Sequence, residues 1–387
     1  MGFRIIAVAL AVFLPSQPAL AQSGNTSPRQ PSESTAKPWW ERLTFFGDLR
    51  VRYEGFFQED SETRQRGRYR LRLGLRTSVA EGLDVTLRLA SGDAADVNST
   101  NQTLTDFFNR KPINIDQASL SFRPPSVPAL TLGAGKFGYP VTRTQLVWDD
   151  DVNWEGAYEQ LGWSIGATNV RLAAAQSPLN DVGSGRDAFL FAESAQVTMR
   201  FARTTLLLSL ADYAFRNPDP LAVALAEREV IRTQQTNGVR RDEAGRVIGY
   251  QSGFNLVDTI ARATFDTGRG DYPLVALADI VVNTRAANDD DGGLWLSASY
   301  GRASTPNTFA AGYTFARVEQ DAVVSAYNFS DMGPATNVVM NMATFSFMPR
   351  NRLNLDATAI FTKLLRVPPG AANPLLTRIQ LDARVSF

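Results

Sequence analysis

Apolar and polar residues alternate along most of the chain after residue 44. The last ten residues show this best, because Ile379, Leu381, Ala383, Val385 and Phe387 alternate with polar or charged residues. A period of two places each set on its own face of a β-strand. The pattern predicts about sixteen strands of the length that crosses a bilayer. The expected segments are 45–54, 67–78, 83–91, 115–123, 130–138, 157–163, 168–176, 189–201, 204–213, 256–266, 272–283, 293–300, 308–318, 338–348, 353–363 and 378–387.

The connections between these segments alternate in length. Connections such as 79–82 and 349–352 are short, whereas the intervening ones, such as 92–114, 139–156 and 214–255, are long. Outer-membrane barrels have short turns at the periplasmic end and long loops at the outer end. We therefore expect an all-β protein, a transmembrane antiparallel up-and-down β-barrel over residues 45–387 with both termini in the periplasm. The alternative, a large soluble all-β protein, does not require alternation of membrane-crossing length throughout.

The N-terminal residues predict export. Arg4 precedes an apolar run over residues 5–14, and Ala19-Leu20-Ala21 has the small residues of a signal-peptidase site. The run is shorter than the roughly twenty apolar residues of a membrane anchor, which is the alternative. We expect a signal peptide over 1–21, cleaved near Ala21, and a disordered periplasmic leader over 22–44. The predicted location is the outer membrane of a Gram-negative bacterium.

Composition narrows the function classes. The chain contains neither His nor Cys, which excludes imidazole and thiolate chemistry, including the Ser-His mechanisms of hydrolases. We therefore expect no enzyme, no catalytic residue, no cofactor and no metal site. The 39 basic residues balance the 39 acidic ones, so no global charge predicts a nucleic-acid partner.

A group of arginines shares the parity opposite to the apolar face of the first three expected strands. An arginine on the lipid face costs roughly 2–4 kcal/mol at the bilayer midplane, so these side chains are expected to face the lumen. The alternative is that they are merely the polar lining that any water-filled lumen needs. We call this set the basic stripe: Arg50, Arg52, Arg68, Arg70, Arg72, Arg76 and Arg88.

An acidic cluster lies in the long connection 139–156, beside Trp148 and Trp154. If this loop folds into the barrel, its carboxylates face the basic stripe, and the field between them filters ions and orients polar solutes. The inward fold is an analogy with general porins. A solvated surface loop and a calcium site are the alternatives. The expected constriction-loop acids are Asp149, Asp150, Asp151 and Glu155.

Several short stretches carry a family resemblance, namely Gly47–Glu54, Arg70–Leu75, Ser99–Leu104, Asp116–Ala118, Gly135–Phe137, Leu146–Asp151, Glu155–Gly156, Asp321–Val324 and Phe387. On these residues the chain resembles the family of Gram-negative outer-membrane barrels described as "Putative porin", and more distantly the alginate-export barrels. The resemblance implies a pore. Similarity to other outer-membrane barrels also implies that the terminal Phe387 is the assembly signal for the barrel-insertion machinery.

The expected function is that of an outer-membrane porin, through which small hydrophilic solutes or ions diffuse passively along a charged lumen. The alternative is a substrate-specific channel or an exporter of acidic, alginate-like polysaccharide. The expected partners are outer-membrane lipid and lipopolysaccharide, the barrel-insertion machinery and small hydrophilic solutes, with a homotrimer as the assembly and no nucleic acid. The residues leave open which solute passes and which sign of ion is preferred.

Overall fold

The computed structural model describes residues 39–105, 107–181, 186–227 and 235–387. The predicted signal peptide and the leader up to residue 38 lie outside these residues. The last part of the expected leader belongs to the folded unit, because Trp39–Arg42 forms the short 3-10 helix η1 and the first strand begins at Thr44.

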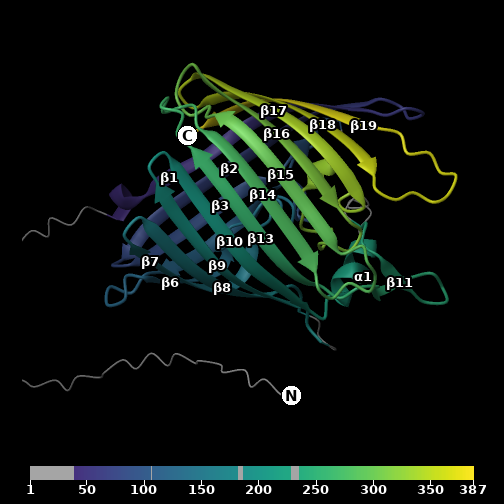
Figure 1. Cartoon of the computed structure of the whole chain (residues 1–387), viewed down its shortest axis with the longest axis horizontal. Helices are drawn as coiled ribbons and strands as arrows, with labels where there is room; N and C mark the ends of the chain where they lie inside the picture. Colours follow the sequence, from purple (N-terminus) through teal and green to yellow (C-terminus); the bar gives the residue numbers. More distant parts are fainter. Residues whose placement is uncertain (1–38, 106, 182–185, 228–234) are drawn as a thin grey trace, which may run out of the picture. The chain divides into compact units, whose positions relative to one another are not determined.

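Sixteen long antiparallel strands of the described residues close into one barrel, as the sequence predicted (Figure 1). The barrel closes because β1 pairs with both β2 and the last strand, β19. The strands are β1 (Thr44–Phe57), β2 (Arg64–Ala80), β3 (Leu83–Ser91), β5 (Ile113–Phe122), β6 (Leu130–Phe137), β7 (Trp154–Ile165), β8 (Thr168–Pro178), β9 (Phe189–Phe201), β10 (Thr204–Arg216), β13 (Asn255–Phe265), β14 (Leu274–Asn283), β15 (Gly292–Gly301), β16 (Thr308–Val318), β17 (Val338–Arg350), β18 (Leu353–Leu364) and β19 (Leu376–Ser386).

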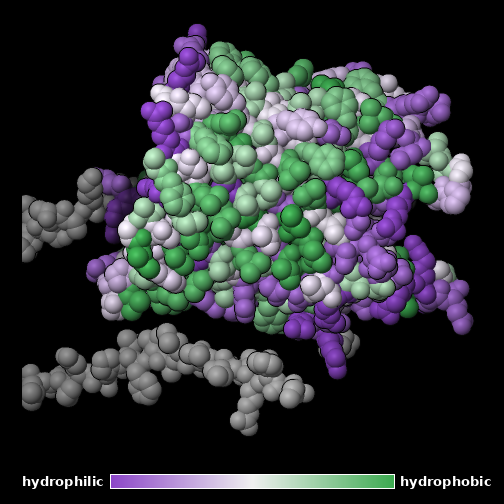
Figure 2. Space-filling view, viewed as in Figure 1, coloured by the Kyte–Doolittle hydropathy of each residue, from purple (hydrophilic) through white to green (hydrophobic). Residues whose placement is uncertain are grey.

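The two faces of the wall follow the alternation. Val51 of β1 and Leu381 of β19 are about half exposed on the outer face, whereas their neighbours Arg52 and Gln380 are buried in the lumen. Figure 2 shows apolar residues spread over the strands of the visible outer face, with polar residues gathered around the loops. Among the described residues, no helix is both long and apolar enough to cross a membrane.

The last residue extends the closing seam between β19 and β1. Phe387 and Gly47 exchange two backbone hydrogen bonds, each 3.0 Å from N to O. A Cβ atom at Gly47 would lie 2.2 Å from the carbonyl oxygen of Arg72 and 2.8 Å from the Phe387 ring. Only glycine fits at this position, because the carbonyl of Arg72 and the ring of Phe387 leave no room for a Cβ atom.

Long and short connections lie at opposite ends of the strands. Short turns occupy 81–82, 166–167, 202–203 and 351–352. At the other end, the connection between β10 and β13 contains helix α1 (Asp219–Glu227) and a hairpin of β11 (Val239–Arg241) and β12 (Val247–Tyr250) (Figure 1). The sequence pattern predicted only a loop here. The two-residue strand β4 (Gln102–Thr103) pairs with β2.

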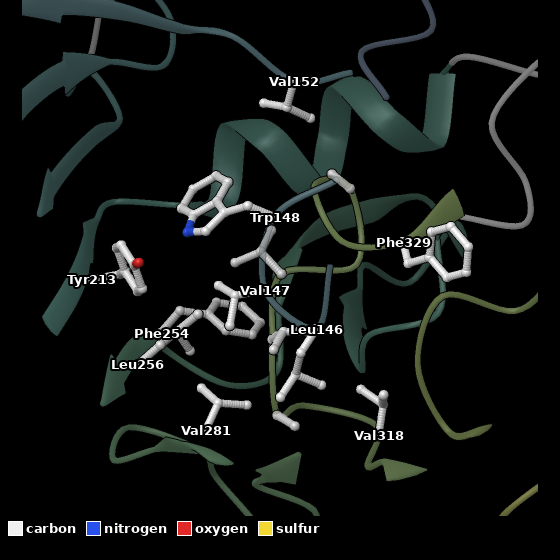
Figure 3. Close-up of a cluster of buried hydrophobic side chains, with 14 of the residues drawn as sticks. Leu146, Val147, Trp148, Val152, Tyr213, Phe254, Leu256, Val281, Val318 and Phe329 are labelled. Atoms are coloured by element: carbon white, nitrogen blue, oxygen red, sulfur yellow. The ribbon is translucent and has the colours of Figure 1, made fainter. Parts of the chain in front are cut away.

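Three connections reach into the barrel. We call them loop L2 (residues 92–101), loop L3 (138–153) and loop L7 (319–337). The apolar core of the protein therefore lies inside the barrel, where Leu146 and Trp148 of L3 and Val323 of L7 are at most 1% exposed. Figure 3 shows Leu146, Val147 and Trp148 packed against the wall residues Tyr213, Leu256 and Val281.

Candidate functional site: the lumen constriction

Aromatic packing holds L3 inside the barrel. The Trp148 ring centroid lies 4.9 Å from that of Trp154, 5.5 Å from that of Tyr213 on β10, and 5.5 Å from that of Tyr327 on L7. Aromatic pairs at such distances contribute about 0.5–1.5 kcal/mol beyond the area they bury. Trp148 thus joins L3 both to the wall and to L7.

Hydrogen bonds join the three inward loops to one another. On L3, Asp149 donates its backbone N–H to the carbonyl of Tyr327 (2.7 Å), and its carboxylate accepts the N–H of Ser330 on L7 (2.9 Å). On L2, Asn98 donates its side-chain amide to the carbonyl of Asn328 on L7 (3.1 Å). The hydroxyl of Ser330 returns a hydrogen bond to the carbonyl of Asn98 (3.2 Å). L2, L3 and L7 therefore form one unit across the lumen.

The basic stripe lies on the opposite wall, and most of its arginines have acidic partners. Arg70 contacts Asp48 (2.7 Å), and Arg88 contacts Asp116 (2.5 Å). Arg76 lies apart from the constriction as an exposed residue near the short turn 81–82, with its guanidinium 5.7 Å from the Phe46 ring.

Part of the basic stripe lies against the inward loops. Arg72 contacts Asp151 of L3, whose carboxylate also accepts the backbone N–H of Thr100 on L2 (2.9 Å). Arg50 donates to the side chain of Asn101 on L2 (2.5 Å). Arg68 lies 3.7 Å from Glu54 on β1. Loop side chains therefore cover this stretch of the wall.

Two further residues complete the site, and the sequence analysis missed both. Asp331 of L7 contacts Arg52 (3.3 Å) and Arg378 of β19 (2.6 Å), and it accepts a hydrogen bond from Gln380 (2.9 Å). Arg52 itself pairs through two hydrogen bonds, of 2.7 and 2.8 Å, with Asp382. Arg378 carries the lumen parity of β19, so closing the sheet onto β1 would have placed it beside the stripe. No strand pattern marks Asp331.

Charge states in the loops follow from these contacts. Burial alone would raise the pKa of Asp331, but Arg378 and Arg52 outweigh burial and hold the pKa below its usual value. Burial likewise opposes ionisation of Asp151, yet Arg72 and Arg70 lower its pKa. Burial and the adjacent Asp151 instead raise the pKa of Asp149 well above its usual value. Asp151 and Asp331 are thus the carboxylates that stay charged as the pH falls.

The other expected acids lie elsewhere. Asp149 is buried and points to backbone N–H groups of L3 and L7, and the exposed Asp150 pairs with Arg143 of its own loop (2.6 Å). Glu155 lies on strand β7 with outer-face parity and pairs with Lys136 (2.5 Å). The strand begins at Trp154, earlier than expected, which removes Glu155 from the loop. Of the four predicted acids, Asp151 alone forms an ion pair with the stripe within the described residues.

The described part of the chain holds no group of three or more acidic side chains arranged to bind a metal ion. The charged groups at the constriction are instead paired as guanidinium and carboxylate, a geometry that favours two parallel hydrogen bonds. The arrangement suits an electrostatic filter.

Comparisons with known proteins agree with this architecture. The sequence profile of the family described as "Putative porin" matches residues 56–241, and a comparison with curated protein sequences gave no match. OprB of Pseudomonas putida, in a structure at high pH, superposes with a TM-score of 0.59 at 14% identity, over 90% of this chain and 95% of that chain.

Two further porin structures share the fold. OmpF of Salmonella typhi, in a complex with daunomycin, gives a TM-score of 0.52 at 10% identity, over 88% of this chain and 97% of that one. A loop-deletion mutant of OmpT from Vibrio cholerae gives 0.50 at 10% identity, over 89% and 99%. At these identities the likeness is one of fold.

The profile match and the barrel fold together support an outer-membrane porin, that is, a channel rather than an enzyme. The profile match over residues 56–241 confirms the predicted resemblance to the "Putative porin" family.

Proposed function

We propose that small hydrophilic solutes and ions diffuse passively through this porin, and that selection occurs where L2, L3 and L7 meet the basic stripe. One observation carries the proposal: Asp151 of L3 and Asp331 of L7 both contact arginines of the opposite wall. Opposed fixed charges at a narrowing select ions by sign and orient polar solutes.

The exporter alternative fits the site less well. An exporter of acidic polysaccharide needs an open bore with free arginines along its wall. Here Arg52, Arg68 and Arg70 are 6–8% exposed and each lies within 4 Å of a carboxylate. Because these arginines are paired and buried, they fit a filter for small solutes better than a binding path for a polyanion.

Liposome swelling with the purified, refolded protein tests the proposed function. We expect fast swelling with small neutral sugars and progressively slower swelling with longer oligosaccharides, because the inward loops narrow the lumen. Planar bilayers should show ohmic conductance in KCl. Efflux of an acidic polysaccharide from loaded liposomes at a rate similar to that of small sugars would contradict the proposal and favour export.

We also propose that Phe387 is the assembly signal. Its deletion removes two backbone hydrogen bonds of the closing seam, a loss of only about 1–3 kcal/mol. A recognition role predicts a larger effect in cells than in vitro. Deletion should strongly reduce folded barrel in the outer membrane while spontaneous refolding into detergent stays near normal, and Phe387→Tyr should restore cellular levels. Equal losses in both settings would indicate a purely structural role.

The proposal includes the cellular setting. The long loops at one end of the strands support an orientation with the turns and both termini in the periplasm, after cleavage of the signal peptide near Ala21. Outer-membrane lipid and lipopolysaccharide surround the apolar wall, and the insertion machinery is a transient partner. A homotrimer is the proposed assembly, which sedimentation of the detergent-solubilised protein tests.

A further inference from the structure

Two aspartates form a buried pair on the lumen wall beside L3. Asp258 on β13 is 1% exposed and Asp279 on β14 is 0% exposed. The two are diagonal neighbours on the lumen face, because Asp258 lies opposite Val281 and Asp279 lies opposite Ile260. Among the described residues, neither oxygen of Asp258 and only one oxygen of Asp279 has a hydrogen-bond partner. One oxygen of Asp279 accepts the hydroxyl of Thr144 on L3.

The pair has no counter-ion. Within the described ranges, no basic side chain forms an ion pair with either carboxyl group. The titratable group that faces them is the phenol of Tyr213 on β10. The other neighbouring side chains are neutral: Thr144 on L3 hydrogen-bonds to Asp279, and Trp295 on β15 is its cross-strand neighbour.

Two neighbouring buried carboxylates cannot both stay charged without a cation, because desolvation and mutual repulsion both oppose it. A proton on one carboxyl group also turns that group into a hydrogen-bond donor toward the other. The geometry therefore requires a proton on at least one of the two carboxyl groups.

Thr144 links this proton to the constriction. Its hydroxyl donates to Asp279 and accepts the backbone N–H of Leu146 (3.1 Å). Leu146 starts the stretch Leu146–Trp148, which is at most 2% exposed and fills the interior of the barrel. A change in the charge of the pair therefore acts directly on the part of L3 that is packed in the lumen.

We infer that Asp258 and Asp279 share a proton and, through Thr144, act as positioning residues that hold L3 inside the barrel. This inference rests on the proposed function, because it concerns the loop that narrows the pore. Loss of the proton in alkaline solution leaves two buried negative charges in contact. Water must then enter around Thr144, and L3 loosens.

A single cysteine reports this loosening, since the chain has no Cys of its own. Val147 lies on L3 and is 2% exposed, so a thiol at this position reacts only when L3 moves. The experiment measures the labelling rate of Val147→Cys across a pH series, in the otherwise native chain and in the Asp258→Asn background. The amide that this second substitution introduces still donates a hydrogen bond to Asp279 but needs no shared proton.

The ratio of the two rates cancels the pH dependence of the thiol itself. At alkaline pH we expect Val147→Cys to be labelled roughly fivefold or more faster in the native background than in the Asp258→Asn background. A factor of five is the lower end of ordinary coupling between two sites. Near neutral pH the two rates should be equal. A ratio that is constant with pH overturns the inference. If Asp258→Asn fails to fold, Asp279→Asn serves as the second background.

Conductance distinguishes this inference from the proposed function. The single-channel conductance of the native protein should change in one alkaline step that Asp258→Asn lacks. The matched control is Asp356→Asn on β18, a partly buried aspartate that lies 3.6 Å from Arg384, and this variant should keep the step. A pore that conducts with no such step overturns the role of the pair and leaves the proposed function intact. A protein without conductance overturns the proposed function itself.

Discussion

Replacing Trp148 with alanine should open the pore. The indole is 1% exposed and contacts Trp154, Tyr213 and Tyr327, so its removal leaves a cavity where L3 meets the wall and L7. Truncating a buried tryptophan costs about 3–5 kcal/mol. That loss falls on the loops, because the hydrogen-bonded wall does not depend on this side chain. We expect a severalfold larger single-channel conductance and faster swelling with longer oligosaccharides.

Trp163→Ala is the matched control for this prediction. Trp163 lies on the same strand, β7, as Trp154, but it is 41% exposed on the outer face. Its truncation should leave conductance unchanged. Both variants need equal folded fractions by heat-modifiable gel mobility before they are compared. If Trp148→Ala folds and conducts like the native protein, then L3 does not set the width of the pore.

The strands of the wall could be predicted from the sequence because alternate residues face lipid and lumen. The lipid face requires apolar side chains, whereas the lumen face accepts polar ones. The arginines of the first strands were assigned to the lumen by parity, and Arg52 and Arg70 lie there. Glu155 was misplaced because the expected strand began at residue 157, whereas β7 begins at Trp154. When the alternation of inward and outward residues is continued from residue 157 back to Trp154, Glu155 falls on the outer face.

The inward loops could not be predicted in the same way. L7 has no alternating pattern, and buried residues such as Ser325, Asn328 and Thr336 read as a solvated loop. Their burial depends on partners from distant loops, such as the hydrogen bond between Asn98 and Asn328. Asp331 belongs to the site only because L7 enters the lumen. Pairing across separate loops leaves no periodic signal in the sequence.

Neutralising the loop carboxylates should shift the ion selectivity of the pore toward anions. Asp151 and Asp331 oppose Arg72, Arg52 and Arg378, so neutralising both acids leaves an excess of positive charge at the narrowing. Two unit charges 4 Å apart in water interact by about 1 kcal/mol, which corresponds to roughly a fivefold change in ion preference per charge removed. Arg52 and Arg378 keep Asp382 and Glu54 as partners, so the wall should stay folded.

The difference in ion selectivity between native and variant channels should depend on salt concentration. It should change only weakly when the solution is made mildly acidic. Screening shortens the Debye length from about 10 Å at 0.1 M to about 3 Å at 1 M salt, so the difference between native and variant channels should shrink in concentrated KCl. Because nearby arginines lower the pKa of Asp331 and of Asp151, both carboxylates stay charged in mildly acidic solution, and the native selectivity should persist there.

The reversal potential in a KCl gradient tests the central claim most directly, measured for the double variant Asp151→Asn/Asp331→Asn beside Asp150→Asn. Asp150 belongs to the same loop as Asp151, but it is exposed and pairs with Arg143 away from the stripe. The account predicts that the double variant shifts strongly toward chloride while Asp150→Asn stays at the native value. Equal reversal potentials for the native protein and the double variant would show that L3 and L7 do not form the filter.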